Sequence, residues 1–82
     1  MVKVIFDNNF KQIFSKIKDD FTKTKIIKQI EKIKKNPEVG KPMKNIRKGT
    51  RELYIKPFRL SYDYHKEKET VEILNFYHKD GQ

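Results

Sequence analysis

The spacing of apolar residues changes along the first half of the chain, and each spacing predicts a different element. Val2, Val4 and Phe6 recur at every second position, which is typical of a β-strand over residues 2–7. Two amphipathic helices follow, because apolar side chains then recur at three- and four-residue intervals. Those side chains are Phe10, Ile13, Phe14 and Ile17 in the first helix, and Ile26, Ile27, Ile30 and Ile33 in the second.

Short polar residues and one proline set the ends of these two helices. Asp7 before the first helix and Asp19 before the second can accept hydrogen bonds from free backbone N–H groups at the helix starts. Asn36-Pro37 ends the second helix, because proline disfavours helical geometry in the residue before it. Residues 38–50 then form a long loop rich in glycine and basic residues.

The last third of the chain predicts three consecutive strands joined by short turns, over residues 51–56, 58–64 and 70–78. The third is apolar on both faces, since Val71 and Ile73 alternate in one phase and Leu74 and Phe76 in the other, which indicates a central strand. We therefore predict one α+β domain over residues 1–82. Its small antiparallel sheet consists of the N-terminal strand plus the three-strand meander, covered on one face by a helical hairpin.

Strand alternation also predicts a sheet with two unlike faces. The side chains expected to face the helices are Leu53, Ile55, Phe58, Leu60, Val71 and Ile73. By the same parity Lys56, Arg59 and His78 fall on the opposite, open face, where Glu52, Tyr54, Ser61 and Asp63 join them.

The net charge of +9 lies entirely in the first part of the chain. Residues 1–50 carry 14 Lys/Arg against 5 Asp/Glu, and residues 51–82 carry 6 of each. Such a field attracts polyanions, nucleic acid first, although solvated faces of lysine-rich helices explain many of these lysines equally well. The absence of cysteine fits a reducing cytoplasm. The apolar runs are too short for a membrane span or a signal peptide.

The open face carries residue types that suit metal-independent RNA cleavage. That reaction needs a base for the 2′-hydroxyl, cations for the charge on the phosphate and an acid for the leaving oxygen. The imidazole of histidine can serve as acid or base at neutral pH, which makes His78 a candidate, while Lys56 and Arg59 can stabilise charge. Two histidines without cysteine or carboxylates at ligand spacing predict no metal and no cofactor. Alternatively, His78 is a surface residue, and Arg59 forms an ordinary cross-strand ion pair with Glu52 or Asp63.

The chain resembles the RelE/ParE superfamily of toxins from toxin–antitoxin modules. The resemblance rests on the order of its motifs, which are Gly40-Lys-Pro-Met-Lys44, Arg51-Glu-Leu-Tyr-Ile, Phe58-Arg-Leu-Ser-Tyr62 and Ile73-Leu-Asn-Phe-Tyr-His-Lys-Asp80. It implies an antitoxin partner that wraps the toxin, for which the charge predicts an acidic segment. In the RelE branch it implies cleavage of mRNA in the ribosomal A site without a metal.

The resemblance also implies site residues. Its expected catalytic set is Lys56, Arg59 and a basic residue near the C-terminus, either His78 or Lys79. We expect the RNA-binding set to be Lys41, Lys44, Arg47, Lys48, Arg51 and Tyr54. Tyr54 and Lys41 stand where relatives carry a basic residue and a carboxylate base respectively, so the general base stays open. The alternatives are a ParE-like gyrase inhibitor without nuclease activity and a non-catalytic basic module that binds nucleic acid.

Overall fold

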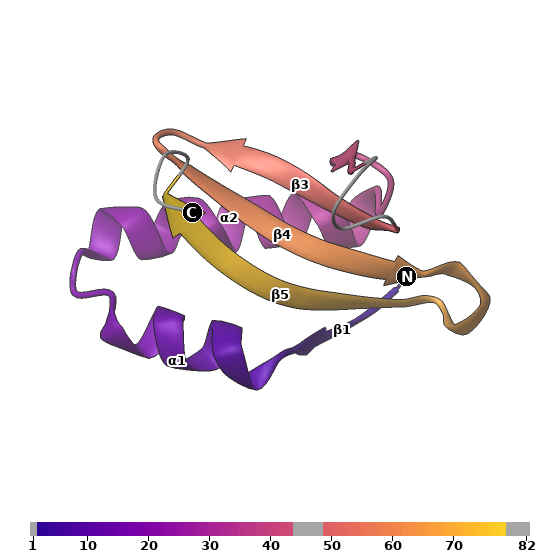
Figure 1. Ribbon diagram of the computed structural model, residues 1–82, viewed down its shortest axis with the longest axis horizontal. Coiled ribbons are helices and arrows are strands. Elements are labelled where there is room, and N and C mark those ends of the chain that lie inside the picture. Colours follow the sequence, from indigo (N-terminus) through magenta and orange to yellow (C-terminus); the bar gives the residue numbers. More distant parts are fainter. Residues whose placement is uncertain (1, 44–48, 79–82) are drawn as a thin grey trace.

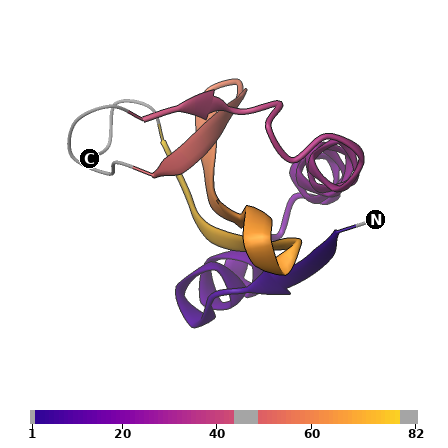
Figure 2. The same cartoon turned by 90° about the vertical axis from the view of Figure 1, so that its right-hand side faces the viewer.

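A computed structural model gives the structure of the protein and describes residues 2–43 and 49–78. In chain order its elements are β1 (Lys3–Phe6), α1 (Asn8–Lys16), α2 (Asp20–Lys35), β2 (Lys41–Pro42), β3 (Thr50–Ile55), β4 (Phe58–His65), a 3-10 turn (Lys66–Lys68) and β5 (Thr70–His78). The described strands form one sheet in the order β1-β5-β4-β3-β2 (Figure 1). Figure 2 shows the sheet curved around α2, with α1 lying against β5.

This arrangement confirms the predicted α+β fold, in which two helices cover a small sheet that contains a C-terminal antiparallel meander. One detail was wrong, because β1 pairs with β5 in parallel, with Lys3 opposite Thr70 and Phe6 opposite Ile73. The two helices between β1 and the meander form the long crossover that a parallel pair requires. The alternation of apolar residues carries no information about strand direction. The short β2, antiparallel to β3, lies within the predicted loop.

Both helices begin at the predicted aspartates. The Asp7 carboxylate accepts a hydrogen bond from the Asn9 backbone N–H at 2.9 Å. Asp19 accepts one from the Phe21 N–H at 3.1 Å and another from the Thr22 hydroxyl at 2.7 Å. The Thr22 bond, followed by the backbone bond, lowers the pKa of Asp19. No helix within the described residues is both long and apolar enough to cross a membrane.

The core lies between the helices and one face of the sheet. Its buried apolar residues are Phe10, Ile26, Ile30, Ile33, Ile55, Leu60, Tyr62, Val71, Ile73 and Phe76. Four of the six strand residues predicted to face the helices are in this set, and the other two, Leu53 and Phe58, are partly buried against it. The prediction of a helix-facing layer is therefore confirmed.

A β-bulge in β5 changes which side chains face the core. Ser61 pairs with Asn75 but Tyr62 pairs with Ile73, so Leu74 is an extra residue. Val71 and Ile73 face the core before the bulge, and Phe76 does so after it. The bulge lies where β1 ends and α1 begins to flank β5. There the Asn9 side-chain amide donates to the Leu74 carbonyl at 3.4 Å and to the Asn75 side chain at 3.2 Å.

Tyr62 anchors the segment that leads from α2 to β2. Its side chain is fully buried, and its hydroxyl accepts from the Gly40 N–H at 2.9 Å and donates to the Pro37 carbonyl at 2.7 Å. Burial raises the pKa of Tyr62, so its hydroxyl stays protonated as a donor. On β3, opposite Tyr62, the Nη1 of Arg51 donates to the carbonyls of Glu38 and Gly40 at 3.0 and 2.8 Å. These bonds fix the start of β2.

Candidate functional site

Three side chains from three adjacent strands meet on the open face of the sheet, and we call Glu52, Arg59 and Tyr77 the Glu52 cluster. Arg59 on β4 lies opposite Tyr54 on β3 and opposite Tyr77 on β5. Its Nη1 is 3.0 Å from Glu52 Oε1, and the Tyr77 hydroxyl donates to Glu52 Oε2. The strands thus place a carboxylate, a guanidinium and a phenol in direct contact.

Burial and charge make this cluster unusual for a surface. The Glu52 side chain is only 4% exposed, whereas that of Arg59 is 38% exposed. A buried carboxylate requires hydrogen-bond donors or a counter-charge, and Arg59 and Tyr77 supply both. The hydrogen bond that Arg59 donates to Glu52 raises the pKa of the guanidinium above its usual value. The exposed part of the guanidinium remains open to a second anion.

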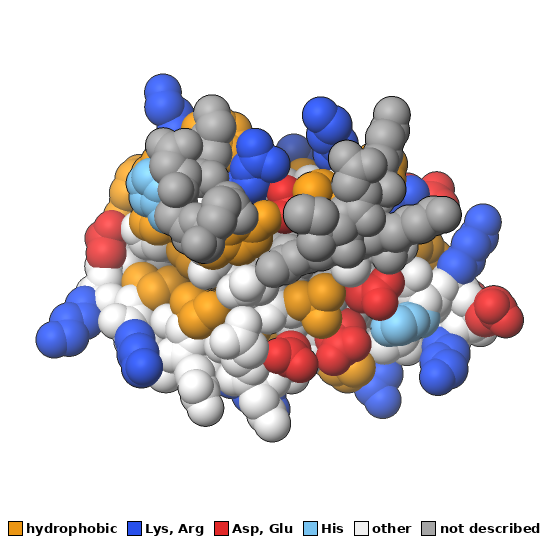
Figure 3. Space-filling view, in the orientation of Figure 1, with side chains coloured by type: hydrophobic (Ala, Val, Ile, Leu, Met, Phe, Trp, Pro, Cys, Tyr) orange, Lys and Arg blue, Asp and Glu red, His pale blue; other side chains and the backbone are white. Residues whose placement is uncertain are grey.

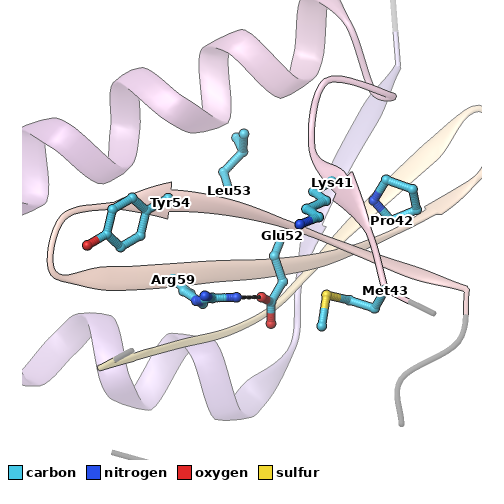
Figure 4. A pocket seen from close by; sticks show the side chains of 7 residues that line it. All are labelled: Lys41, Pro42, Met43, Glu52, Leu53, Tyr54 and Arg59. Atoms are coloured by element: carbon cyan, nitrogen blue, oxygen red, sulfur yellow. Dashed lines mark hydrogen bonds and ion pairs between the residues drawn. The ribbon is translucent and has the colours of Figure 1, made fainter. Parts of the chain in front are cut away.

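A pocket of about 510 Å³ adjoins the Glu52 cluster. Its lining residues are Lys41, Pro42, Met43, Glu52, Leu53, Tyr54 and Arg59. Figure 4 shows the β2 side chains on one side of this pocket and the Glu52–Arg59 pair on the other. Tyr54, which is 54% exposed, offers an accessible ring at the same site. The pocket therefore combines an aromatic surface, a lysine and an ion pair.

The open face is not uniformly basic. Asp63 on β4 lies opposite Glu72 on β5, and His65 Nε2 lies 3.6 and 3.7 Å from their carboxylates. Figure 3 shows acidic side chains gathered beside a histidine toward the β4–β5 hairpin. A polyanion would therefore be repelled at this end of the face and favoured near Arg59 and Lys41.

The structure separates the three residues expected to share the open face. Arg59 lies on that face as predicted, and Lys56 is exposed in the turn between β3 and β4. The prediction that His78 lies on the open face was wrong, because His78 pairs with Phe58 and packs edge-on against that ring, with ring centroids 5.5 Å apart. The bulge at Leu74 shifts β5 by one residue, so Tyr77 takes the place expected for His78.

The predicted RNA-binding residues are also divided. Lys41 and Tyr54 line the pocket. Arg51 instead pairs with Tyr62 on the helix side and binds backbone carbonyls there. The other three, Lys44, Arg47 and Lys48, lie outside the described residues, as does the catalytic candidate Lys79.

Tyr77 is the site residue that the sequence interpretation missed. The sequence does contain a sign of it, because the alternation of apolar residues shifts by one position between Ile73 and Phe76. We attributed that shift to a central strand that is apolar on both faces. That inference was itself correct, since β5 lies between β1 and β4. The alternative that Arg59 forms a cross-strand ion pair with Glu52 is confirmed. Among the described residues no group of three or more histidine, cysteine or acidic side chains is placed to hold a metal ion.

Comparison with known proteins places this fold in context. The family model for the ParE toxin of type II toxin–antitoxin systems, parDE, matches residues 4–82. No curated protein matches the chain.

Solved structures of RelE toxins share the fold. The intact E. coli RelBE toxin–antitoxin complex contains a chain with a TM-score of 0.83 and 13% identity, covering 98% of this chain and 99% of that one. The isolated E. coli RelE toxin gives the same TM-score and identity, with coverage of 100% and 88%. The RelBE2 complex from Mycobacterium tuberculosis gives 0.81 and 24%, with coverage of 95% and 98%.

Proposed function

Since the chain belongs to the RelE/ParE toxin superfamily, as a toxin of a type II toxin–antitoxin system, we propose that it is a ribosome-dependent mRNA endonuclease. The observation that carries this proposal is the Glu52 cluster, a buried carboxylate held by Arg59 and Tyr77 beside an open pocket. Its parts match the requirements of metal-independent RNA cleavage. The cytoplasm, where mRNA is translated, is the proposed place of action.

In the proposed reaction Glu52 accepts the proton of the 2′-hydroxyl as that oxygen attacks phosphorus. The bond from phosphorus to the 5′-oxygen breaks, leaving a 2′,3′-cyclic phosphate and a 5′-hydroxyl. Arg59 then exchanges part of its contact with Glu52 for the phosphate oxygens, where the guanidinium stabilises the developing charge. Tyr77, released from Glu52, donates a proton to the leaving oxygen. Lys56 and Lys41, both exposed, add cations near the phosphate backbone.

Tyr54 and the expected antitoxin complete the proposal. The exposed Tyr54 ring is suited to stack on an unpaired base of the message. The partner is an antitoxin with an acidic segment, since relatives of the same fold were solved in RelBE complexes and this chain carries +9.

Primer extension on mRNA bound to programmed ribosomes tests the cluster directly. We expect Glu52→Gln and Arg59→Ala each to reduce cleavage about 100-fold or more. Glu72→Gln is the matched control, because it neutralises another carboxylate of the open face outside the cluster. His78→Ala should cut nearly as well as the parent. Equal cleavage by the parent and Arg59→Ala would remove the cluster from the active site.

Gyrase inhibition, which the ParE branch of the superfamily implies, is the second candidate. Two observations favour it: Glu52 already neutralises Arg59, and His78 lies away from the open face. This candidate predicts lost DNA supercoiling with intact mRNA. Supercoiling and primer-extension assays on the same purified chain therefore separate the two functions.

A further inference from the structure

A buried serine hydroxyl lies beside the Glu52 cluster without belonging to it. Ser61 on β4 is fully buried, and its hydroxyl has no hydrogen-bond partner among the described residues. The other buried side-chain atom of this kind in the described part of the chain is Nε of Arg59, two residues earlier on the same strand. A buried polar atom without a partner costs free energy, and native folds keep few of them. Both of these atoms lie next to Glu52, which indicates a role at that site.

Ser61 lies directly opposite Glu52 in the sheet. The two residues are paired across β3 and β4, which are neighbouring strands (Figure 1), so their side chains point to the same face. The Cβ atoms of residues paired in this way are about 5 Å apart. A change of side-chain rotamer is therefore enough to bring the Ser61 hydroxyl within hydrogen-bond distance of the Glu52 carboxylate.

Glu52 is also the acceptor with room for this hydroxyl. On β5 the residue opposite Ser61 is Asn75. Its side-chain oxygen already accepts from the Phe76 N–H at 2.9 Å and from the Asn9 amide at 3.2 Å. A carboxylate offers about four acceptor positions, and the contacts within the Glu52 cluster occupy two of them. Of the two cross-strand neighbours of Ser61, Glu52 is therefore the one that can take a further donor.

The proposed reaction creates a need for such a donor. At rest the buried Glu52 carboxylate is held by Arg59 and Tyr77. During the reaction Arg59 turns to the phosphate and Tyr77 is released, which would leave a buried carboxylate without its donors. Lys41, the neighbour of Glu52 on the edge strand β2, is exposed and can follow the phosphate backbone instead. Ser61 is the buried donor that stays beside the carboxylate.

We propose that Ser61 is a positioning residue, whose hydroxyl donates to the Glu52 carboxylate when Arg59 and Tyr77 leave it for the substrate. This inference deepens the proposed function and rests on the exchange of partners described there. The new hydrogen bond keeps the carboxylate oriented toward the 2′-hydroxyl and supplies a donor while Glu52 is still ionised. The hydroxyl that has no partner in the resting chain thus gains one during the reaction.

Urea unfolding of a double-mutant cycle tests this hydrogen bond without any substrate. In the parent background Ser61→Ala should leave the urea midpoint unchanged or raise it, since the lost hydroxyl has no partner among the described residues. In the Tyr77→Phe background, where Glu52 has lost one donor, the same substitution should lower the midpoint by about 1 M. Tyr64→Phe is the matched control background, because it removes a tyrosine hydroxyl that does not contact Glu52, and Ser61→Ala should behave there as in the parent. Equal effects of Ser61→Ala in all three backgrounds would overturn the proposal.

Single-turnover cleavage of mRNA on programmed ribosomes tests the role of Ser61 in the reaction. Ser61→Ala should cleave about 10-fold more slowly at saturating ribosome concentration, with the half-saturating concentration unchanged, because the hydroxyl acts on Glu52 and does not touch the substrate. A hydroxyl with a merely structural role would not give a variant that is as stable as the parent and yet cleaves more slowly. Cleavage by Ser61→Ala at the parent rate would overturn the positioning role. A parent chain that cleaves no RNA would overturn the proposed function together with this role, whereas the double-mutant cycle decides separately whether Ser61 holds Glu52.

Discussion

Replacing Tyr62 by phenylalanine tests how the segment between α2 and β2 is held. The substitution keeps the buried ring and removes only the hydroxyl that joins Gly40 to Pro37. Gly40 is buried, so its N–H would lose its partner without gaining free access to water. We expect Tyr62→Phe to lower the stability of the fold and to loosen the wall of the Lys41 pocket.

The size of the effect follows from the two lost contacts. An unsatisfied buried donor or acceptor costs about 1–3 kcal/mol, and the Pro37 carbonyl is only partly buried. The free energy of unfolding should therefore fall by about 2–3 kcal/mol. For a domain of this size that corresponds to a fall in Tm of about 10–20 °C. Urea unfolding followed by circular dichroism measures the first quantity, and a thermal scan measures the second.

Tyr64→Phe is the control, because it removes a tyrosine hydroxyl from the same strand, two residues after Tyr62. The structure shows no hydrogen bond from the Tyr64 hydroxyl to another described residue, so we expect a change within about 0.5 kcal/mol. A loss of less than about 0.5 kcal/mol in Tyr62→Phe would refute the proposed anchor. It would mean that water or a shifted loop replaces the hydroxyl at no cost.

Three further predictions concern the same segment and the start of α2. Gly40→Ala should destabilise the chain by about 1–3 kcal/mol in urea unfolding, because the added Cβ would lie 2.7 Å from the Tyr62 hydroxyl oxygen. Arg51→Leu should speed amide exchange across the loop before β2 while leaving the core amides unchanged, since it removes two bonds to loop carbonyls. Asp19→Asn should cost stability at pH 6, and the difference from the parent should shrink as the pH falls below about 4. Because the pKa of Asp19 is lower in the folded chain than its unfolded value of about 3.9, the ionised carboxylate stabilises the fold above that pH. This stabilisation is lost as the pH falls through the pKa of the folded state.

Periodicity predicted the elements and the core because it reports burial directly. Ile26, Ile30 and Ile33 repeat with helical spacing and are buried on one side of α2. Ile55 and Leu60 alternate in the strands and are buried as expected. Each of these positions depends on local spacing, which a single sequence contains.

The errors arose where contacts between distant segments decide the geometry. The bulge at Leu74 lies where α1 replaces β1 beside β5, and the Asn9 side chain bonds the displaced backbone. No spacing within residues 70–78 reveals that neighbour. A single extra residue was enough to exchange His78 for Tyr77 on the open face. Glu52 was likewise placed on the correct face, but its burial depends on partners from β4 and β5.

The parallel pair of β1 and β5 constrains the order in which a newly made chain can complete its fold. Lys3 meets Thr70 and Phe6 meets Ile73, so the first strand must wait for a partner made near the end of synthesis. Contacts of such long sequence separation form slowly and late. During translation the two helices can form while their apolar faces still lack most of the sheet. The chain therefore closes its core, and assembles the Glu52 cluster on β3, β4 and β5, only after residue 77 has left the ribosome that made it.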